Sequence, residues 1–299
     1  MRILVTPLDW GLGHASRSAA VVKYLIDKNY EVIIGGSGES YLLLRKQFPS
    51  LRAIDIPSFS PWTPSWLPFP LAITIQLPYF FFCIIREYYI TQRIARKYNI
   101  DLIISDNRYG VHSPTCRAAI ITHQLSPIPW IGCPQWIRNI VSWGISKLIS
   151  KFNFCLIPDY PDHRLSGTLS RTRHISPCRQ IFTGPLSRYT EYKRDITRRD
   201  IANLGILTGP KEVRRQQEKE LSIIDDILII GSPSSSSLIT SPQEIADLIQ
   251  RSQRIYSHSG YTTIMDLYCL NALSRAFLTP TKGQGEQEYL AALLQVSNK

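Results

Sequence analysis

The chain has 299 residues, which favours two domains, and its 44% hydrophobic and 19% charged residues exclude a disordered chain. Residues 1–184 carry 20 Lys and Arg against 10 Asp and Glu, whereas residues 185–299 carry 14 against 13. The basic first part favours anionic lipid or a phosphorylated substrate as a partner. It does not favour nucleic acid, because no basic helix with interleaved aromatic residues is present.

The first part alternates short apolar runs with helical patterns, which is typical of a parallel α/β sheet. The N-terminus begins with an apolar strand rather than a signal peptide, and we expect a cytoplasmic protein. Helices are expected at Ser16–Asp27 and Glu39–Gln47. The expected strands are Arg2–Thr6, Glu31–Gly35, Leu51–Ile56, Leu102–Ser105, Ala119–Thr122, Phe154–Ile157 and Ile181–Thr183.

The segment Ile56–Ile85 contains no charged residue but has eight aromatic residues and six prolines. Its length raises the possibility of a membrane span, which the prolines argue against. A buried loop with a core helix and a surface that enters a membrane interface are the other two interpretations. Arg86, Arg93, Arg96 and Lys97 follow the segment and would suit anionic headgroups, or would form a solvated helix face.

The strand and helix pattern restarts after a charged stretch, Arg188–Asp200, which we interpret as a linker. We therefore divide the chain into domains 1–187 and 188–299, each with a doubly wound parallel sheet, facing a cleft. Strands are expected at Asn203–Leu207, Ile227–Ile230, Ile255–Ser257 and Arg275–Leu278, and helices near Glu212–Leu221, Pro242–Arg251 and Thr262–Leu270.

The six cysteines include no Cys-x-x-Cys pair, which argues against a zinc ribbon or a disulfide scaffold and favours reduced thiols.

Polar residues follow the strands of the first domain. Gly11 and Gly13 would let the backbone turn closely around a ligand, and His14 stands where a general base is often found. Asp106 could orient His14, as the third group of a hydrolytic triad does, or could cap the next helix. His14 could likewise only cap a helix. Asn107, Arg108 and His123 complete this set, and His123 equally fits a buried, hydrogen-bonded histidine.

Two further motifs follow strands of the second domain. Ser259 and Gly260, followed by Tyr261, Thr262, Thr263 and Asp266, would suit a diphosphate and a ribose, or a plain Ser/Thr cap ahead of a core helix. Gln284, Glu286 and Gln287 cluster on one turn after the last strand, where amides and carboxylates suit sugar hydroxyls.

In combination these motifs resemble GT-B glycosyltransferases of the family 28 type, which includes the bacterial N-acetylglucosaminyltransferase that forms lipid II. The resemblance is stronger still to uncharacterised glycosyltransferases of Bacteroidetes-type bacteria. The matching segments are Trp10–Arg17, Ser105–Gly110, Thr122–Leu125, Ile157–Asp159, Gly184–Arg188, Ser259–Leu267 and Gln284–Ala291. The family's second glycine-rich loop is represented only by Leu207–Pro210, and a short or truncated second domain is expected.

The resemblance implies an inverting, metal-independent transfer of N-acetylglucosamine or another hexose from a UDP-sugar to a lipid-linked or glycan acceptor. His14 and Asp106 would be catalytic, and Gly11, Gly13, Asn107, Arg108 and His123 would bind the acceptor. No cofactor is implied beyond the UDP-sugar substrate. The donor-binding set would be Gly209, Ser259, Gly260, Tyr261, Thr262, Thr263, Asp266, Gln284, Glu286 and Gln287.

The basic first domain also predicts peripheral binding to an anionic inner membrane face. Two alternative functions remain open, a non-catalytic nucleotide-sugar-binding protein and a UDP-sugar epimerase on the same fold.

Overall fold

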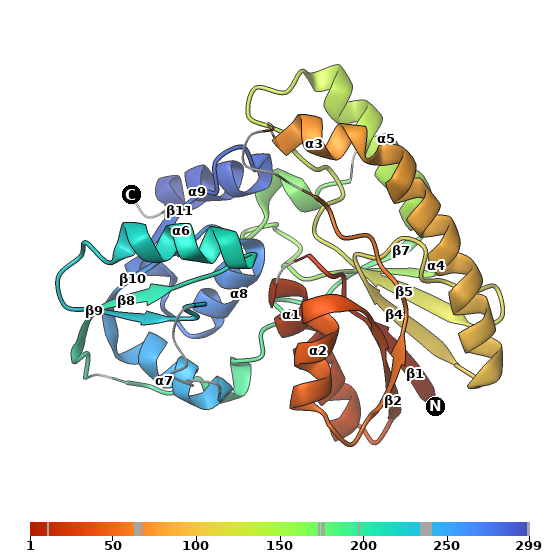
Figure 1. Cartoon of the computed structure of the whole chain (residues 1–299), viewed down its shortest axis with the longest axis horizontal. Helices are drawn as coiled ribbons and strands as arrows, with labels where there is room; N and C mark the ends of the chain where they lie inside the picture. Colours follow the sequence, from red (N-terminus) through yellow and green to blue (C-terminus); the bar gives the residue numbers. More distant parts are fainter. Residues whose placement is uncertain are drawn as a thin grey trace. The chain divides into compact units, whose positions relative to one another are not determined.

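The computed structural model describes residues 1–10, 12–62, 67, 69–172, 174, 177–196, 198–233 and 241–297. The chain divides into two compact units, Met1–Gly184 and Pro185–Lys299. Each unit is built around its own parallel sheet with helices packed against it (Figure 1).

Unit 1 contains a seven-stranded sheet in the order β3-β2-β1-β4-β5-β6-β7, in which all neighbours are parallel. The strand order reverses between β1 and β4, and ligands of such sheets bind beyond the carboxyl ends of the strands at this switch point. The strands are β1 (Arg2–Thr6), β2 (Glu31–Gly36), β3 (Arg52–Asp55), β4 (Leu102–Asp106), β5 (Arg117–Ile121), β6 (Phe154–Ile157) and β7 (Arg179–Phe182).

The helices of unit 1 cover both faces of this sheet. Neighbouring strand residues point to opposite faces, and accordingly Ile34 packs with α1 and α2, whereas Ile33 belongs to the large core that α4 and α5 cover. The helices are α1 (Leu12–Asp27), α2 (Gly38–Gln47), α3 (Phe69–Ile75), α4 (Leu77–Lys97) and α5 (Gln135–Ile149), with a 3-10 turn at Gly167–Ser170.

Unit 2 contains a four-stranded parallel sheet in the order β11-β10-β8-β9, with its switch point between β8 and β10. Its strands are β8 (Ile201–Ile206), β9 (Ile227–Ile230), β10 (Ser252–His258) and β11 (Ala276–Thr279). Its helices are α6 (Lys211–Leu221), α7 (Pro242–Arg251), α8 (Tyr261–Cys269) and α9 (Gly285–Ser297), with 3-10 turns at Thr190–Tyr192 and Leu273–Arg275.

The two doubly wound parallel sheets predicted from the sequence are confirmed, and each expected strand is present with its ends moved by at most a few residues. Helix α1 differs more, because it begins at Leu12 rather than Ser16 and thus includes Gly13 and His14.

The stretch Arg188–Asp200 is not the simple linker expected from its charges. Tyr189 is buried in the core of unit 2 with Leu204 and Ile255, and Gln250 of α7 binds the backbone of Tyr192 and Arg194. The aromatic residues of this stretch hold it against the unit, which a reading of its charges alone does not reveal.

The described part of the uncharged segment Ile56–Ile85 contains both buried and exposed side chains. Phe59 and Cys83 are buried and Phe80 packs against the core, whereas Phe81 and Phe82 are exposed. None of the helices within the described residues is both long enough and apolar enough to cross a membrane.

Candidate active site

His14 and Asp106 lie together at the switch point of the unit 1 sheet. Asp106 is the last residue of β4, and His14 lies in the first turn of α1, which follows the neighbouring strand β1. His14 Nδ1 lies 3.0 Å from Asp106 Oδ1. Asp106 is fully buried, whereas the side chain of His14 keeps 18% of its surface exposed. The imidazole can therefore meet a ligand while the carboxylate stays shielded from water.

Arg17 and Ser18, one turn along α1, complete the surroundings of Asp106. Arg17 Nε donates to Asp106 Oδ2 at 3.1 Å, Arg17 Nη2 pairs with Oδ1, and Ser18 Oγ donates to Oδ2 at 3.2 Å. Burial by itself raises the pKa of Asp106, but the charges of Arg17 and His14 outweigh it and lower this pKa to about 2. Asp106 is therefore an anion at neutral pH.

The contacts of His14 Nδ1 favour one tautomer. Arg17 Nη2 lies 3.0 Å from the same nitrogen, and Nδ1 cannot both accept from Arg17 and donate to Asp106. An ionised carboxylate is the stronger acceptor, so we assign the proton to Nδ1, where it is donated to Asp106. Nε2 then carries the lone pair and can take a proton.

Sequence reasoning missed Arg17. The available signal was its spacing: positions i and i+3 of a helix share a face, so a residue three after His14 lies beside it.

The remaining predicted residues of unit 1 are placed differently. Gly11 lies outside the described residues, and Gly13 lies in the first turn of α1. Asn107 takes a left-handed conformation with a φ of 57° directly after β4 and accepts a hydrogen bond from the Tyr109 hydroxyl at 3.3 Å. His123 is buried just beyond β5.

Arg108 is fully buried and forms an internal ion pair. Its Nε donates to Glu87 Oε1 at 3.1 Å, and its Nη2 donates to the carbonyls of Ile56 and Pro57 at 3.0 and 2.8 Å. These contacts fasten α4 and the segment after β3 to the end of β4. They give Arg108 a structural explanation that its sequence position did not reveal.

In unit 2, Ser259 links the carboxyl ends of β10 and β11. Its amide donates to the Thr279 carbonyl at 3.0 Å, and its hydroxyl donates to the Gln287 carbonyl at 2.8 Å. The Ser259 amide is thus already engaged. Helix α8 begins directly after Gly260, and the first amides of a helix have no partner within it. The first turn, which contains Tyr261, Thr262 and Thr263, is the part of this motif suited to an anion.

His258 lies at the end of β10 beside this helix start and was not among the predicted site residues. It is only 8% exposed, and its Nδ1 lies 2.8 Å from Thr281 Oγ1, whereas its Nε2 has no hydrogen-bond partner among the described residues. Burial lowers the pKa of His258, although Glu220 opposes this, so we treat the ring as neutral at pH 7. A buried polar atom without a partner marks a position where a ligand atom would fit.

Asp266 lies on α8 and accepts a hydrogen bond from the Ser187 hydroxyl at 2.5 Å. Burial raises the pKa of Asp266 to about 6, although Arg188 and Ser187 partly oppose the shift. Ser187 also accepts the amide of Tyr189, so that Asp266 is fixed to the segment that enters unit 2.

The glutamine loop after β11 is organised by its own hydrogen bonds. Gln287 Oε1 accepts the Thr281 amide at 2.9 Å, and Gln287 Nε2 donates to Gln284 Oε1 at 2.7 Å. Glu286 lies in the first turn of α9. Gly209, between β8 and α6, has a φ of 91°, a conformation that glycine adopts without strain.

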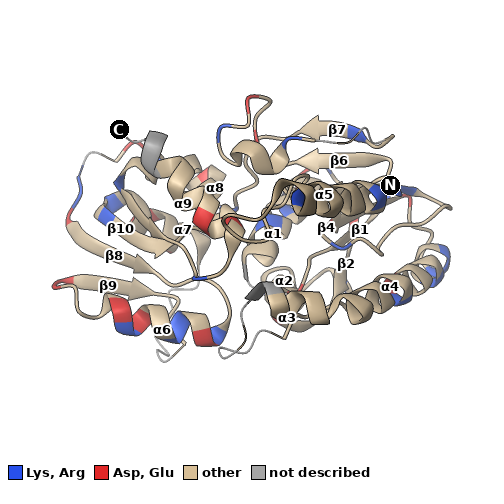
Figure 2. Ribbon diagram, turned by 90° about the horizontal axis from the view of Figure 1, so that it is seen from above, with Lys and Arg blue, Asp and Glu red and all other residues tan. Residues whose placement is uncertain are grey.

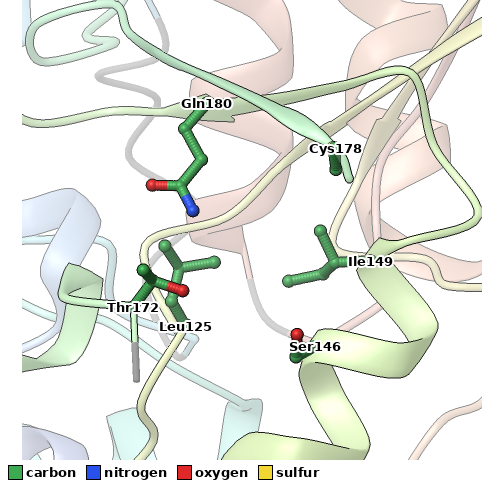
Figure 3. Close-up of a pocket in the computed structure, with 6 residues that line it drawn as sticks. All are labelled: Leu125, Ser146, Ile149, Thr172, Cys178 and Gln180. Atoms are coloured by element: carbon green, nitrogen blue, oxygen red, sulfur yellow. The ribbon is translucent and has the colours of Figure 1, made fainter. Parts of the chain in front are cut away.

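A small cavity lies elsewhere in unit 1, lined by Leu125, Ser146, Ile149, Thr172, Cys178 and Gln180 (Figure 3). Its volume of about 10 Å³ holds at most one water molecule, so it is not a substrate site. Within the part of the chain that the structure describes, no three His, Cys, Asp or Glu side chains gather as a metal site.

Solved structures of glycosyltransferases are similar to the chain over nearly its whole length. Arabidopsis thaliana UGT89C1, complexed with UDP-L-rhamnose, matches 99% of this chain and 82% of its own at 12% identity, with a TM-score of 0.60. The spinosyn rhamnosyltransferase SpnG matches 99% and 84% at 11% identity, with a TM-score of 0.54. MurG of Acinetobacter baumannii matches 99% and 83% at 11% identity, with a TM-score of 0.51.

These similarities show that the chain has the GT-B glycosyltransferase fold. No protein-family profile and no curated protein matches the sequence.

Proposed function

We propose that the chain is a glycosyltransferase that moves a hexose, such as N-acetylglucosamine, from a UDP-sugar to a lipid-linked or glycan acceptor. The observation that carries the proposal is the contact between His14 and Asp106 at the switch point of the unit 1 sheet. The GT-B fold supports the class of reaction, and the UDP-sugar bound to the similar UGT89C1 supports the class of donor.

In this proposal His14 is the general base. Its Nε2 takes the proton of the acceptor hydroxyl, and the freed oxygen forms the bond to the anomeric carbon of the donor sugar. The bond between that carbon and the UDP oxygen breaks, and its electron pair leaves with UDP. Because attack and departure occur on opposite sides of the carbon, the configuration inverts. Asp106 stabilises the imidazolium that forms, because the ion pair with Arg17 keeps the Asp106 carboxylate ionised.

The donor would bind to unit 2. The first-turn amides of α8 and the Nε2 of His258 would donate hydrogen bonds to the diphosphate and stabilise its negative charge without a metal ion. Asp266 would accept hydrogen bonds from the ribose hydroxyls, and Gln284, Glu286 and Gln287 would lie near the sugar. Gly13, Asn107 and His123 are the acceptor contacts that we retain from the sequence.

The test is a transfer assay with UDP-sugars and a panel of lipid-linked and glycan acceptors, with UDP binding measured by calorimetry. We expect His14→Ala to lower turnover by roughly 10²- to 10⁴-fold while UDP affinity stays close to that of the wild type. UDP binding without any product would favour a non-catalytic binding protein, and release of an epimerised UDP-sugar would favour an epimerase. A wild-type rate in His14→Ala would overturn the assignment of the base.

A further inference from the structure

The outer face of α4 is apolar and ends in cations. Phe82, Ile85 and Tyr89 are all more than half exposed and follow one another at spacings of three and four residues, which places them on one side of the helix. Arg86 and Arg93 are exposed on the same side. The opposite side of α4, which includes Cys83 and Ile94, packs into the core of unit 1. The exposed apolar side chains of α4 therefore do not contribute to the packing of the unit 1 core.

Helix α5 has a similar outer stripe. Trp136, Ile140, Trp143 and Lys147 follow at spacings of four, three and four residues, so they share one side of the helix. Trp136 is 64% exposed and Trp143 is 54% exposed, and the Lys147 ammonium lies 5.8 Å from the centre of the Trp143 ring. This stripe lies outside the uncharged segment Ile56–Ile85, for which the sequence suggests contact with a membrane interface.

The two stripes lie over the same face of the unit 1 sheet. Ile94 of α4 and Ile149 of α5 belong to one core cluster, whereas Ala19 of α1 and Leu44 of α2 belong to the cluster on the other face. A groove of about 550 Å³ lies along α4 and brings apolar and cationic side chains together, with Phe82, Ile85, Arg86, Tyr89, Ile90 and Arg93 as its lining.

The charges on these two helices have one sign wherever they are exposed. Helix α5 contains no Asp or Glu, and the only acidic residue of α4, Glu87, is buried against Arg108. Lys and Arg lie along both helices (Figure 2). The exposed cations are Arg86, Arg93, Arg96, Lys97 and Lys147. The apolar and cationic outer faces of α4 and α5 are complementary to a partner that has an apolar interior and a negatively charged surface.

We propose that the outer faces of α4 and α5 form one docking surface for a bilayer that contains anionic phospholipids. The tryptophan and tyrosine rings would lie at the level of the headgroups, where such amphipathic rings concentrate. Arg86, Arg93 and Lys147 would meet the lipid phosphates. The inference deepens the proposed function and rests on it for its purpose, because it states where the protein meets a lipid-linked acceptor.

The test is flotation with vesicles of phosphatidylcholine alone and with vesicles of equal parts phosphatidylcholine and phosphatidylglycerol, at low and high salt. We expect binding to the anionic vesicles that salt reduces but does not abolish, because salt screens the cations and not the burial of apolar rings. Vesicles with brominated acyl chains should quench the tryptophan fluorescence of the bound protein.

Two variants separate the contributions. Trp136→Ser combined with Trp143→Ser should lower the partitioning that remains at high salt by at least about ten-fold and should remove most of the quenching. Arg86→Gln combined with Arg93→Gln should lower partitioning at low salt by roughly 25-fold, as expected for two cations close to an anionic surface.

Matched controls come from the other face of the sheet. Tyr24 of α1 is 61% exposed and Leu42 of α2 is 59% exposed, so Tyr24→Ser with Leu42→Ser removes similar apolar surface. Lys28→Gln with Lys46→Gln removes two exposed cations. These controls should bind vesicles as the wild type does, and circular dichroism and UDP binding verify the fold of each variant.

Three results would overturn the inference. These are no binding of the folded wild type to anionic vesicles at low salt, an equal loss of binding in the controls, or a dimer that the tryptophan variant disperses. The last result would show that a second copy covers the surface. Vesicle binding needs no transfer reaction, so an inactive protein that binds vesicles would contradict the proposed function alone.

Discussion

Arg17 and Asp106 form a buried ion pair that joins the first helix of unit 1 to the end of β4. Arg17 Nε donates to Asp106 Oδ2 at 3.1 Å, and neither side chain is more than 2% exposed. The same carboxylate contacts His14, which is the more exposed member of the group. Arg17 thus keeps Asp106 ionised, and Asp106 in turn fixes the orientation of the imidazole.

The ion pair predicts an acid-sensitive contribution to stability. The pKa of Asp106 is about 2 in the folded chain against 3.8 ordinarily, so its contribution to stability is present above pH 4 and is lost as the pH falls through 2. Its size is about 2 to 3 kcal/mol, since one pKa unit corresponds to about 1.4 kcal/mol. Denaturant unfolding at a series of pH values measures it.

Two variants serve as its controls. The free energy of unfolding of Asp106→Asn should be lower than that of the wild type at pH 4, and this difference should shrink as the pH falls from 4 to 2. Arg17→Met should shrink or reverse this acid loss, because burial then raises the pKa of Asp106 without opposition from Arg17, and a carboxyl loses stability in acid only when its folded pKa lies below 3.8. Equal pH dependence in the wild type and Asp106→Asn would contradict the assignment.

Asp266 predicts both an affinity and its pH dependence. If Asp266 binds ribose, Asp266→Ala should weaken UDP binding by about 1.5–3 kcal/mol, the loss expected for charged hydrogen bonds. Since burial raises the pKa of Asp266 to about 6, acid should protonate it and weaken binding as the pH falls through 6. Calorimetry with a UDP-sugar measures this without the terminal phosphate of UDP, which also titrates near 6. The affinity of Asp266→Asn for the UDP-sugar should not change with pH near 6. Unchanged affinity in Asp266→Ala would remove Asp266 from the site.

His258 predicts a contact with phosphate rather than with the nucleoside. If the Thr281 hydroxyl donates to Nδ1, then Nε2 carries the proton and can donate it to the diphosphate. We expect His258→Ala to weaken UDP binding by about 1.5–3 kcal/mol while the affinity for uridine stays unchanged. Competition binding with UDP and uridine measures both, and equal losses for the two ligands would place His258 elsewhere.

From the buried ion pair between Glu87 and Arg108 we expect that loss of Arg108 destabilises the fold and that removal of both charges restores part of the stability. Arg108→Met should lower the free energy of unfolding by about 3–5 kcal/mol, because it leaves the buried Glu87 without its cation. Burial already raises the pKa of Glu87, and Arg108 opposes that shift. The double variant Glu87→Gln and Arg108→Met should recover a large part of the loss, as measured by chemical denaturation. A stable Arg108→Met protein with a raised KM for the acceptor would instead support the acceptor-binding role expected from the sequence.

Sequence patterns are sufficient to predict the two parallel sheets and the positions of the residues that follow their strands. Short apolar runs such as Leu102–Ser105, set between helical patterns, are typical of buried strands in a parallel sheet, and polar residues after parallel strands collect at one edge. His14 and Asp106 could be paired on that ground alone.

Contacts between distant segments of the chain establish which charged and aromatic side chains are buried. The local sequence around Arg17 and Arg108 does not distinguish them from surface arginines. In the structure, each is buried beside a carboxylate that is distant along the chain. Phe80 packs into the core whereas its neighbours Phe81 and Phe82 face outward, and Trp136 and Trp143 stay exposed. Burial depends on which segments meet in three dimensions, and local sequence does not contain that information.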